Sequence, residues 1–559
     1  MGFGLFSFAA LLGLVLDAAV TAADKSTVTY EWRVTYISSA CDGVSLTEYG
    51  INGNSSSLAV IEVELGQTVQ VAVTNELDEP TCLHWHGLQQ LGTQEMDGTS
   101  DITQCAIAAG GSAVYTFTPE RAGTFWWHSH HSTQYAYGLR GALIVHAPAD
   151  EQQSWEQEVA AEYTLQFADL YHALPGIVPM WDSMIINSLG RYNCTAAASH
   201  GYSECNTDQP LSRFKFEAGS KYRLRLINMG ALAPFDFSID GHEFAVVAAD
   251  GEYLQPSDEI TTLRINAGQR YDIIVEAKAA SSSSTGGSFW IRATGLYGLP
   301  WTAGTASIAG DGFNYEGLAI VYYDEDDTDE PTSSDWTETT TIEEFAFTPL
   351  ETAVLPTVPS DRAILEFDFR RGLGYFSIDG ADYLHFAAPE EPPLFTIAAG
   401  LKTEELPATA LARKIEYGKH IEVVLVNDMN EQHPFHMHTH SPWVVGSGAA
   451  SLSDIQAGNL NLKLDGAMKR DVYTVPPCDT DASGACTNHG YVVLRFTADN
   501  PGVWIIHCHI DWHLDAGLAM ILVEGEDELQ AAGADAFANS ILSVCGTPIT
   551  NSTSSNSTA

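Results

Sequence analysis

The sequence is poor in basic side chains. It holds 25 lysines and arginines against 72 aspartates and glutamates, a formal net charge of −47 over 559 residues. A surface of this sign repels phosphate backbones and anionic lipid headgroups. We therefore expect no nucleic-acid partner and interpret the charge as one that keeps the protein in solution. Attraction of cationic substrates or metal ions is the alternative.

Long apolar runs are also missing beyond the N-terminus. No stretch after residue 22 has the length of a membrane-spanning helix, so no membrane partner is expected. Residues 1–22 are apolar from Leu5 to Val15 and end in small residues at Ala22. Although the basic residues usual at its start are absent, this segment is typical of a cleaved secretory signal.

N-linked glycosylation sequons agree with secretion. The segment 546–559 contains two of them and no apolar stretch, which predicts a glycosylated tail without a lipid anchor. We expect an extracellular, monomeric protein. The four sequons begin at Asn54, Asn193, Asn551 and Asn556.

The chain has nine cysteines, an odd number for an oxidising compartment. If Cys508 binds a metal, eight remain to form disulfides, and the sequence does not fix their pairing. Two pairs lie in short polar loops where local bridges could close, namely Cys194 with Cys205 and Cys478 with Cys486.

An internal repeat organises the chain. NELDEPTCLHWHG (75–87) and NDMNEQHPFHMHTH (427–440) each follow an alternating run and place H-x-H nine residues after the asparagine. PERAGTFWWHSH (119–130) and ADNPGVWIIHCH (498–509) each place H-x-H five residues after a glycine. Between them, YRLRLINMGALAPFDFSIDG (222–241) repeats the first pattern, with Phe237 and Ile239 in place of histidines. We therefore predict three copies of one domain, the middle copy without ligands.

Alternating or β-branched runs separated by Gly, Asn, Asp and Pro predict an all-β protein of antiparallel sandwiches or barrels. A short helix is expected within 525–542. The predicted domains are 23–150, 151–325 and 342–545, with an acidic linker at 326–341.

The histidines suggest two metal sites. Side chains two apart in a strand share a face, so each H-x-H aims two imidazoles in one direction, and Cys508 points the opposite way. Cys508, His513 and His433 form a His₂Cys set, which is the ligand signature of blue copper. Zinc would accept the same donors but offers no redox use for the other histidines. These histidines are His84, His86, His128, His130, His436, His438, His507 and His509.

The segments HWHG, HSH, HPFHMH and HCHIDWHLDAGL resemble the four copper-binding signatures of multicopper oxidases, most closely those of three-domain, fungal-type laccases. The resemblance implies three tandem cupredoxin-like Greek-key domains and four copper ions. It assigns type 1 copper to His433, Cys508 and His513, with Leu518 as a non-coordinating axial residue. It assigns type 2 copper to His84 and His436, and the type 3 pair to His86, His128, His130, His438, His507 and His509.

The resemblance also implies a reaction. A reducing substrate gives single electrons to the type 1 copper, Cys508 passes them to its neighbours His507 and His509, and O₂ is reduced to water. Asp97 and Asp511 match acidic positions that supply protons. Their alternative role is to orient ligands.

Substrate choice is expected to depend on loops. DSMIINSLGRY (182–192) resembles the laccase segment whose aspartate binds the substrate, which implies that Asp182 accepts a hydrogen bond from a phenol or aromatic amine beside His513. A loop aspartate that only caps a turn is the alternative. Trp181 and Ala136 stand where such laccases often have a disulfide, whereas Cys105 and Cys545 match another family bridge. Ferroxidase, ascorbate oxidase and a non-catalytic copper-binding protein remain the alternative functions.

Overall fold

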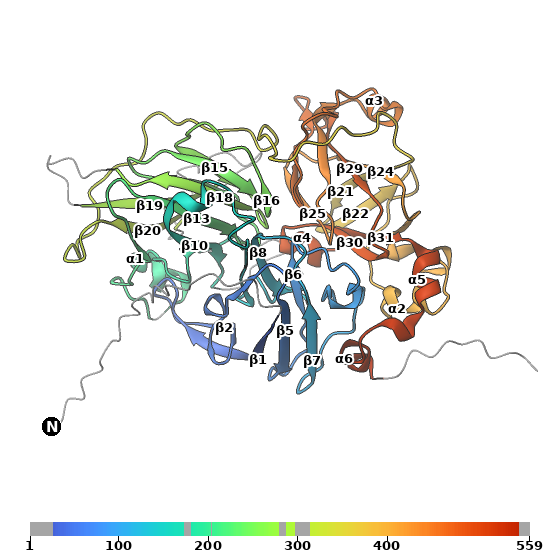
Figure 1. Ribbon diagram of the computed structural model, residues 1–559, viewed down its shortest axis with the longest axis horizontal. Helices are drawn as coiled ribbons and strands as arrows, with labels where there is room; N and C mark the ends of the chain where they lie inside the picture. Colours follow the sequence, from blue (N-terminus) through green and yellow to red (C-terminus); the bar gives the residue numbers. More distant parts are fainter. Residues whose placement is uncertain (1–25, 173–179, 203, 279–286, 297–313, 547–559) are drawn as a thin grey trace, which may run out of the picture.

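The computed structural model describes residues 26–172, 180–202, 204–278, 287–296 and 314–546. Within them the chain forms mainly strands, arranged in six sheets, so the all-β prediction is confirmed. Figure 1 shows three lobes that meet at a common centre, blue at the bottom, green at the left and orange at the right. The predicted signal at 1–22 and the tail from residue 547 onward lie outside the described residues.

The first lobe holds two sheets, with strand orders β3-β2-β1-β5-β7 and β4-β9-β8-β6. Valines at alternate positions of β5 are buried, as the alternating run predicts. The strands are β1 (Thr27–Ser39), β2 (Leu46–Ile51), β3 (Asn54–Ser55), β4 (Ile61–Glu64), β5 (Thr68–Asn75), β6 (Leu83–His86), β7 (Ser112–Phe117), β8 (Gly123–Ser129) and β9 (Arg140–His146).

The middle lobe repeats this plan with orders β11-β10-β13-β18-β15-β16 and β12-β20-β19-β14-β17. Phe237 and Ile239 of β14 are fully buried, so apolar packing fills the place of an H-x-H pair. The strands are β10 (Val159–Leu170), β11 (Ser183–Ile186), β12 (Arg213–Lys215), β13 (Lys221–Asn228), β14 (Phe235–Ile239), β15 (Phe244–Ala249), β16 (Glu252–Tyr253), β17 (Thr262–Ile265), β18 (Arg270–Glu276), β19 (Ser288–Gly295) and β20 (Glu316–Tyr322).

The third lobe has orders β22-β21-β24-β29-β26 and β23-β31-β30-β25-β27, with β28 paired to β29. Between β20 and β21 the chain forms no helix and only isolated bridges. The strands are β21 (Asp361–Arg370), β22 (Leu373–Ile378), β23 (Ala412–Ile415), β24 (His420–Asn427), β25 (His433–Met437), β26 (Trp443–Ala450), β27 (Val472–Val475), β28 (Asp479–Thr480), β29 (Cys486–Thr497), β30 (Gly502–Cys508) and β31 (Ala519–Glu524).

Short helices lie at the edges of the sheets. The helix expected within 525–542 is present as α5, followed by α6. None of the helices in the described residues combines the length and apolar character needed to cross a bilayer. The helices are α1 (Cys194–Ala197), α2 (Pro393–Ala398), α3 (Leu452–Ala457), α4 (Asp511–Asp515), α5 (Glu526–Ala532) and α6 (Asn539–Leu542).

The asparagine landmarks of the repeat do the same work in each lobe. Asn75, Asn228 and Asn427 end equivalent strands, and all three are fully buried. Each accepts a hydrogen bond from the backbone N–H two residues on and donates its amide N–H to distant carbonyls. The side chain thus satisfies buried backbone groups where the chain turns toward the next strand.

Strand β30 is buried on both faces. Ile505 packs into the core shared with the first lobe, whereas Ile506 and Cys508 belong to the core that contains Phe367 of β21. Side chains alternate along a strand, so the histidines on either side of Cys508 share the face of Ile505. The strand therefore presents a thiol to one lobe and imidazoles to another.

Candidate metal centres

A thiol and two imidazoles meet inside the third lobe. Strand pairing sets Phe435 of β25 opposite Cys508 of β30, which brings His433 beside the sulfur. Cys508 Sγ lies 3.6 Å from His433 Nδ1 and 3.6 Å from His513 Nδ1, where His513 comes from α4. The three donor atoms lie within 4.8 Å of one another. The structure thus brings together the three residues of the expected His₂Cys set.

Burial shapes the protonation of this group. It raises the pKa of the Cys508 thiol well above its ordinary value, because a buried thiolate loses its hydration. It also lowers the pKa of His513 to about 3 and holds that of His433 well below the usual range. The imidazoles are therefore neutral and able to bind a metal, and a bound cation is what would stabilise the thiolate.

Leu518 lies against this group and offers no donor atom. Its carbonyl accepts a hydrogen bond from the Cys508 N–H, at 3.1 Å, and its own N–H donates to the His513 carbonyl, at 2.8 Å. The side chain is fully buried in the core that contains Cys508. Gly374 packs so closely that an added Cβ would lie 2.7 Å from the Leu518 Cα.

The four H-x-H pairs converge where the first and third lobes meet. Pairing of β6 with β8 sets His84 opposite His128, and pairing of β25 with β30 sets His436 opposite His507. Rings from the two lobes stack, with centroids 3.9 Å apart for one pair and 3.8 Å for another. Three groups of three histidine donors lie within 4.8 Å of one another. They are His84/His86/His128, His84/His436/His438 and His130/His438/His507.

The eighth histidine, His509, joins them through His86, with His509 Nε2 and His86 Nδ1 3.2 Å apart. Burial is the main cause that lowers the pKa of seven of these rings, and neighbouring imidazoles add to it. The pKa of His507 is lowered to about 4, and those of six others lie well below the ordinary value. The six are His86, His128, His130, His436, His438 and His509.

The ring nitrogens divide their roles in a way that suits metal binding. The Nδ1 atoms of His84, His128 and His436 lie 2.7 to 2.9 Å from carbonyl oxygens, to which they donate. Their Nε2 atoms are buried and have no hydrogen-bond partner. An orphaned imidazole nitrogen costs free energy in a core, whereas a metal ion would satisfy it. The donor set thus fits bound copper.

Two carboxylates predicted from the sequence lie at this cluster. Asp97 accepts hydrogen bonds from the Thr99 hydroxyl, at 2.7 Å, and from His438 Nδ1, at 2.9 Å. Asp511 opens α4, and one of its buried oxygens has no partner. Burial, followed by Asp515 and Asp169, raises its pKa well above the ordinary value.

Sequence reasoning missed Asp471. Its Oδ1 lies 3.0 Å from His86 Nε2 and its backbone carbonyl 2.9 Å from His436 Nδ1. The available signal was a charged Arg-Asp pair directly before the buried strand VYTV. Asp471 is thus a third carboxylate at the cluster.

Asp182 directly precedes β11. Its backbone N–H donates to the Leu170 carbonyl, and its Oδ2 accepts the His172 N–H at 2.8 Å. Its side chain is 10% exposed, and burial raises its pKa above the ordinary value. The same end of β10 reaches α4, because Trp512 Nε1 donates to the Tyr171 hydroxyl at 3.2 Å.

The cysteines form three disulfides among the described residues. Cys105–Cys545 confirms the pair implied by resemblance, and the two local bridges expected in loops are also present. Cys41 and Cys82 stay thiols, so six rather than eight cysteines are paired. Burial raises the pKa of each of these thiols to about 12.

Known protein families match three segments of the chain. Three multicopper oxidase family profiles match residues 33–150, 124–323 and 385–528. Laccase-2 of Pleurotus ostreatus is 33% identical over 491 residues, which cover 84% of this chain and 82% of that protein. Laccase-5 of Trametes villosa is 33% identical over 85% of this chain and 84% of that protein.

Solved structures agree. The laccase of Botrytis aclada matches with a TM-score of 0.78 and 27% identity, over 95% of this chain and 94% of that one. Fet3p, a multicopper oxidase that functions in iron import, matches with a TM-score of 0.75 and 25% identity, over 93% and 94%. The chain belongs to the multicopper oxidase family, with cupredoxin-type lobes and copper as its cofactor. Within that family it is a laccase-like oxidoreductase.

Proposed function

We propose that the protein oxidises phenols and aromatic amines by single electrons and couples this to the reduction of O₂ to water. One feature of the chain carries the proposal. Cys508 of the thiol group is bonded through the backbone to His507 and His509 of the histidine cluster, so one strand links the two centres. Four bound copper ions would supply the redox chemistry, taking up single electrons and delivering four to dioxygen.

The proposed copper ligands are the residues of the two candidate metal centres. His433, Cys508 and His513 would hold the type 1 ion, and the neighbouring Leu518 offers it no donor atom. A copper site without a methionine ligand would be more oxidising than one with it. His84 and His436 hold the type 2 ion. The type 3 pair takes His86, His128, His130, His438, His507 and His509.

Proton transfer at the cluster falls to Asp97 and Asp511. Asp511 has a free buried oxygen and lies with His128, His130, His507 and His509 along one small cavity. A carboxylic acid whose pKa is raised by burial keeps its proton to a higher pH than an exposed one and can donate it there. Asp97 orients His438 and His84 through hydrogen bonds, in addition to any transfer.

Substrate recognition falls to Asp182 and His513. An ionised Asp182 would accept the hydrogen bond of a phenol or aniline and take its proton as the ring loses an electron. The backbone N–H of His172 donates a hydrogen bond to Oδ2 of Asp182. The other carboxylate oxygen, Oδ1, lies 3.8 Å from the ring atom Nδ1 of His172. This arrangement keeps the side chain in one orientation.

The test compares a phenol, an aromatic amine, Fe(II) and ascorbate as electron donors. We expect Asp182→Ala to lower kcat/KM for the phenol by 10²- to 10⁴-fold, roughly the contribution of one general base. Asp208→Ala, an exposed aspartate of the same lobe, is the matched control. Unchanged phenol turnover in Asp182→Ala, with strong Fe(II) oxidation in both proteins, would contradict the proposal.

Ferroxidase activity is the second candidate, supported by the likeness to Fet3p. It needs carboxylates free to bind iron near His433. Asp428, five residues before His433, is already engaged by the Tyr383 hydroxyl and by His489. This engagement counts against iron binding at Asp428, whereas Glu431, two residues before His433, is a half-buried carboxylate that keeps ferroxidase activity as the second candidate. Ascorbate oxidation is the third candidate, tested by the same comparison, and O₂ uptake separates all three from a non-catalytic copper protein.

We infer that the protein is secreted and acts as a monomer. The sequon asparagines Asn54 and Asn193 are exposed, as attachment of a glycan requires. Enzymatic removal of N-glycans from the secreted protein would lower its apparent mass. Retention of full mass would contradict glycosylation.

A further inference from the structure

Among the described residues, no histidine of the middle lobe belongs to the candidate metal centres, yet one turn of this lobe lies against the histidine cluster. The turn joins β17 to β18 and spans residues 266–269. Gly268 has φ +84°, and an added Cβ would lie 2.7 Å from Cδ2 of His509. The turn therefore packs on the ring of a proposed copper ligand.

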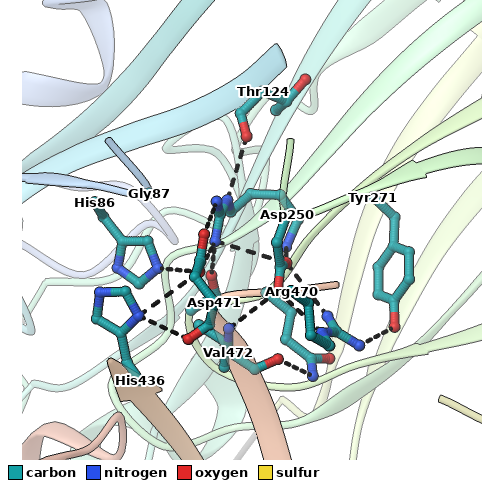
Figure 2. Close-up of polar contacts among 12 residues, drawn as sticks. His86, Gly87, Thr124, Asp250, Tyr271, His436, Arg470, Asp471 and Val472 are labelled. Carbon is teal, nitrogen blue, oxygen red and sulfur yellow. Dashed lines mark hydrogen bonds and ion pairs between the residues drawn. The ribbon is translucent and has the colours of Figure 1, made fainter. Parts of the chain in front are cut away.

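Arg270, the first residue of β18, forms an ion pair with Asp471 of the third lobe. Its two terminal nitrogens donate to the two carboxylate oxygens, each at 2.6 Å, and both side chains are buried. A bidentate ion pair of this kind fixes the plane of the carboxylate as well as its position. Figure 2 shows Asp471 between the histidines His86 and His436 on one side and a second acid, Asp250, on the other.

Asp471 in turn holds two histidines of the cluster. Its Oδ1 lies 3.0 Å from His86 Nε2, and its backbone carbonyl 2.9 Å from His436 Nδ1 (Figure 2). A carboxylate and a carbonyl are acceptors, so each nitrogen donates its proton and the opposite nitrogen keeps its lone pair. The nitrogens that keep the lone pair are Nδ1 of His86 and Nε2 of His436.

Arg270 cannot move without disturbing this arrangement. Its backbone N–H donates to Asp250 Oδ1 at 2.8 Å, and its Nε donates to the Thr124 carbonyl at 3.2 Å. Asp250 also binds Arg470 and the N–H of Val472, directly after Asp471. Gly87, which follows His86, leaves no room, since an added Cβ would lie 2.4 Å from an Arg270 nitrogen. All three lobes thus meet at this guanidinium.

We propose that Arg270 is a positioning residue for the copper cluster, fixing through Asp471 the tautomer and ring orientation of His86 and His436. The inference rests on the proposed function, because it takes these histidines as copper ligands. The middle lobe would then influence the copper cluster through Arg270 without supplying a copper ligand.

The test uses Arg270→Met and Arg270→Lys in the full-length, copper-loaded protein. We expect Arg270→Met to keep the blue absorption of type 1 copper and to lose 10- to 100-fold in type 2 copper affinity, the usual effect of a ligand-orienting residue. Its type 2 electron paramagnetic resonance signal should also change. Arg270→Lys should retain more copper, but with an altered signal, because lysine keeps the charge and lacks the fork.

Arg223→Met is the matched control. Arg223 is an equally buried arginine of the middle lobe, paired with Asp272 and Glu156 and not with Asp471. We expect it to lower the unfolding temperature while leaving copper content and the type 2 signal unchanged. Equal copper loss in Arg223→Met and Arg270→Met would assign the effect to general instability and overturn the proposal.

Full copper content with a wild-type resonance signal in Arg270→Met would also overturn it. If that variant does not fold, Asp471→Asn is used instead, because it keeps the side-chain shape and replaces one carboxylate oxygen that Arg270 binds. An unchanged type 2 resonance signal in Asp471→Asn would likewise overturn the proposal. None of these measurements uses a reducing substrate, so a wild-type protein that binds copper without oxidising phenols contradicts the proposed function alone.

Discussion

At the scale of the residue, burial acts in opposite directions on neighbouring side chains of β30. It lowers the pKa of His507 to about 4 and raises that of Cys508. Both shifts have one cause, since a low-dielectric interior disfavours whichever form is charged. The imidazole is therefore ready to bind copper, whereas the thiol must lose its proton as the metal arrives.

Cys508→Ser tests the role of the sulfur. We expect the variant to lose the intense visible absorption of a copper thiolate and to retain about three copper ions instead of four. Phenol oxidation should fall to background. Serine is close to cysteine in size, so the unfolding temperature of the metal-free protein should change by only a few degrees. Visible spectroscopy and copper analysis provide the measurement, and a variant that keeps its colour would show that the sulfur is misassigned.

Asp182 gives a prediction on pH. Burial raises its pKa above the ordinary value, and only the ionised form can take the proton of a phenol. Phenol oxidation should therefore be full above this raised pKa and decline as pH falls through it. Asp182→Asn should remove this acidic limb. A donor that loses no proton, such as ferrocyanide, is the control for kcat/KM profiles, and the same limb with ferrocyanide would contradict the assignment.

At the scale of the element, short strands set the distance between side chains that the chain itself keeps far apart. β22 supports the thiol group from one side, because Gly374 packs on the backbone of Leu518 and donates its N–H to the Ala516 carbonyl. The turn between α4 and β31 is thereby held against Cys508. Any side chain on β22 at this point must displace that turn.

Gly374→Ala is expected to shift the visible band of the type 1 copper, because the new Cβ would lie within 2.7 Å of Leu518. Overpacking of this kind costs roughly 1–3 kcal/mol in the free energy of unfolding. Gly287→Ala, where the nearest atom lies 3.7 Å away, is the control. Denaturant unfolding and visible spectra of both variants test this, and an unshifted band in Gly374→Ala would contradict it.

At the scale of the whole molecule, the proposed copper cluster would tie the first and third lobes together. The buried nitrogens without partners come from both lobes. Removing the metal leaves them unsatisfied at the interface, which weakens the contact between lobes.

Copper removal by chelation should therefore lower the unfolding temperature. A ligand at a thousand times its Kd stabilises the folded state by about 4 kcal/mol per site. We expect a fall of at least about 5 °C that is reversed by added copper, measured by calorimetry. Equal unfolding temperatures with and without copper would mean that the metal is not bound where proposed.

Much of this could be predicted from the sequence, because the repeat and the H-x-H spacing encode local geometry. A strand period of two is enough to assign His507 and Cys508 to opposite faces. The sequence predicts the position of Asn75 and its two counterparts in the repeat. It does not predict their hydrogen bonds, because these join segments that only the fold brings together.

Contacts between lobes could not be predicted in this way. Asp471 and Arg270 are separated by 201 residues, and nothing local in either segment indicates that they pair. The same holds for Cys41 and Cys82, because disulfide formation depends on distances that only the folded chain defines.

The two faces of β30 have a further consequence. Hydrogen bonding to β25 on one edge and β31 on the other fixes the strand's register. A slip by one residue would turn the thiol toward the first lobe and the imidazoles away from it. In the proposed reaction the route between the two centres would run through the covalent bonds of Cys508 and its neighbours, so loosening of the surrounding protein should leave the intrinsic rate of internal electron transfer nearly constant.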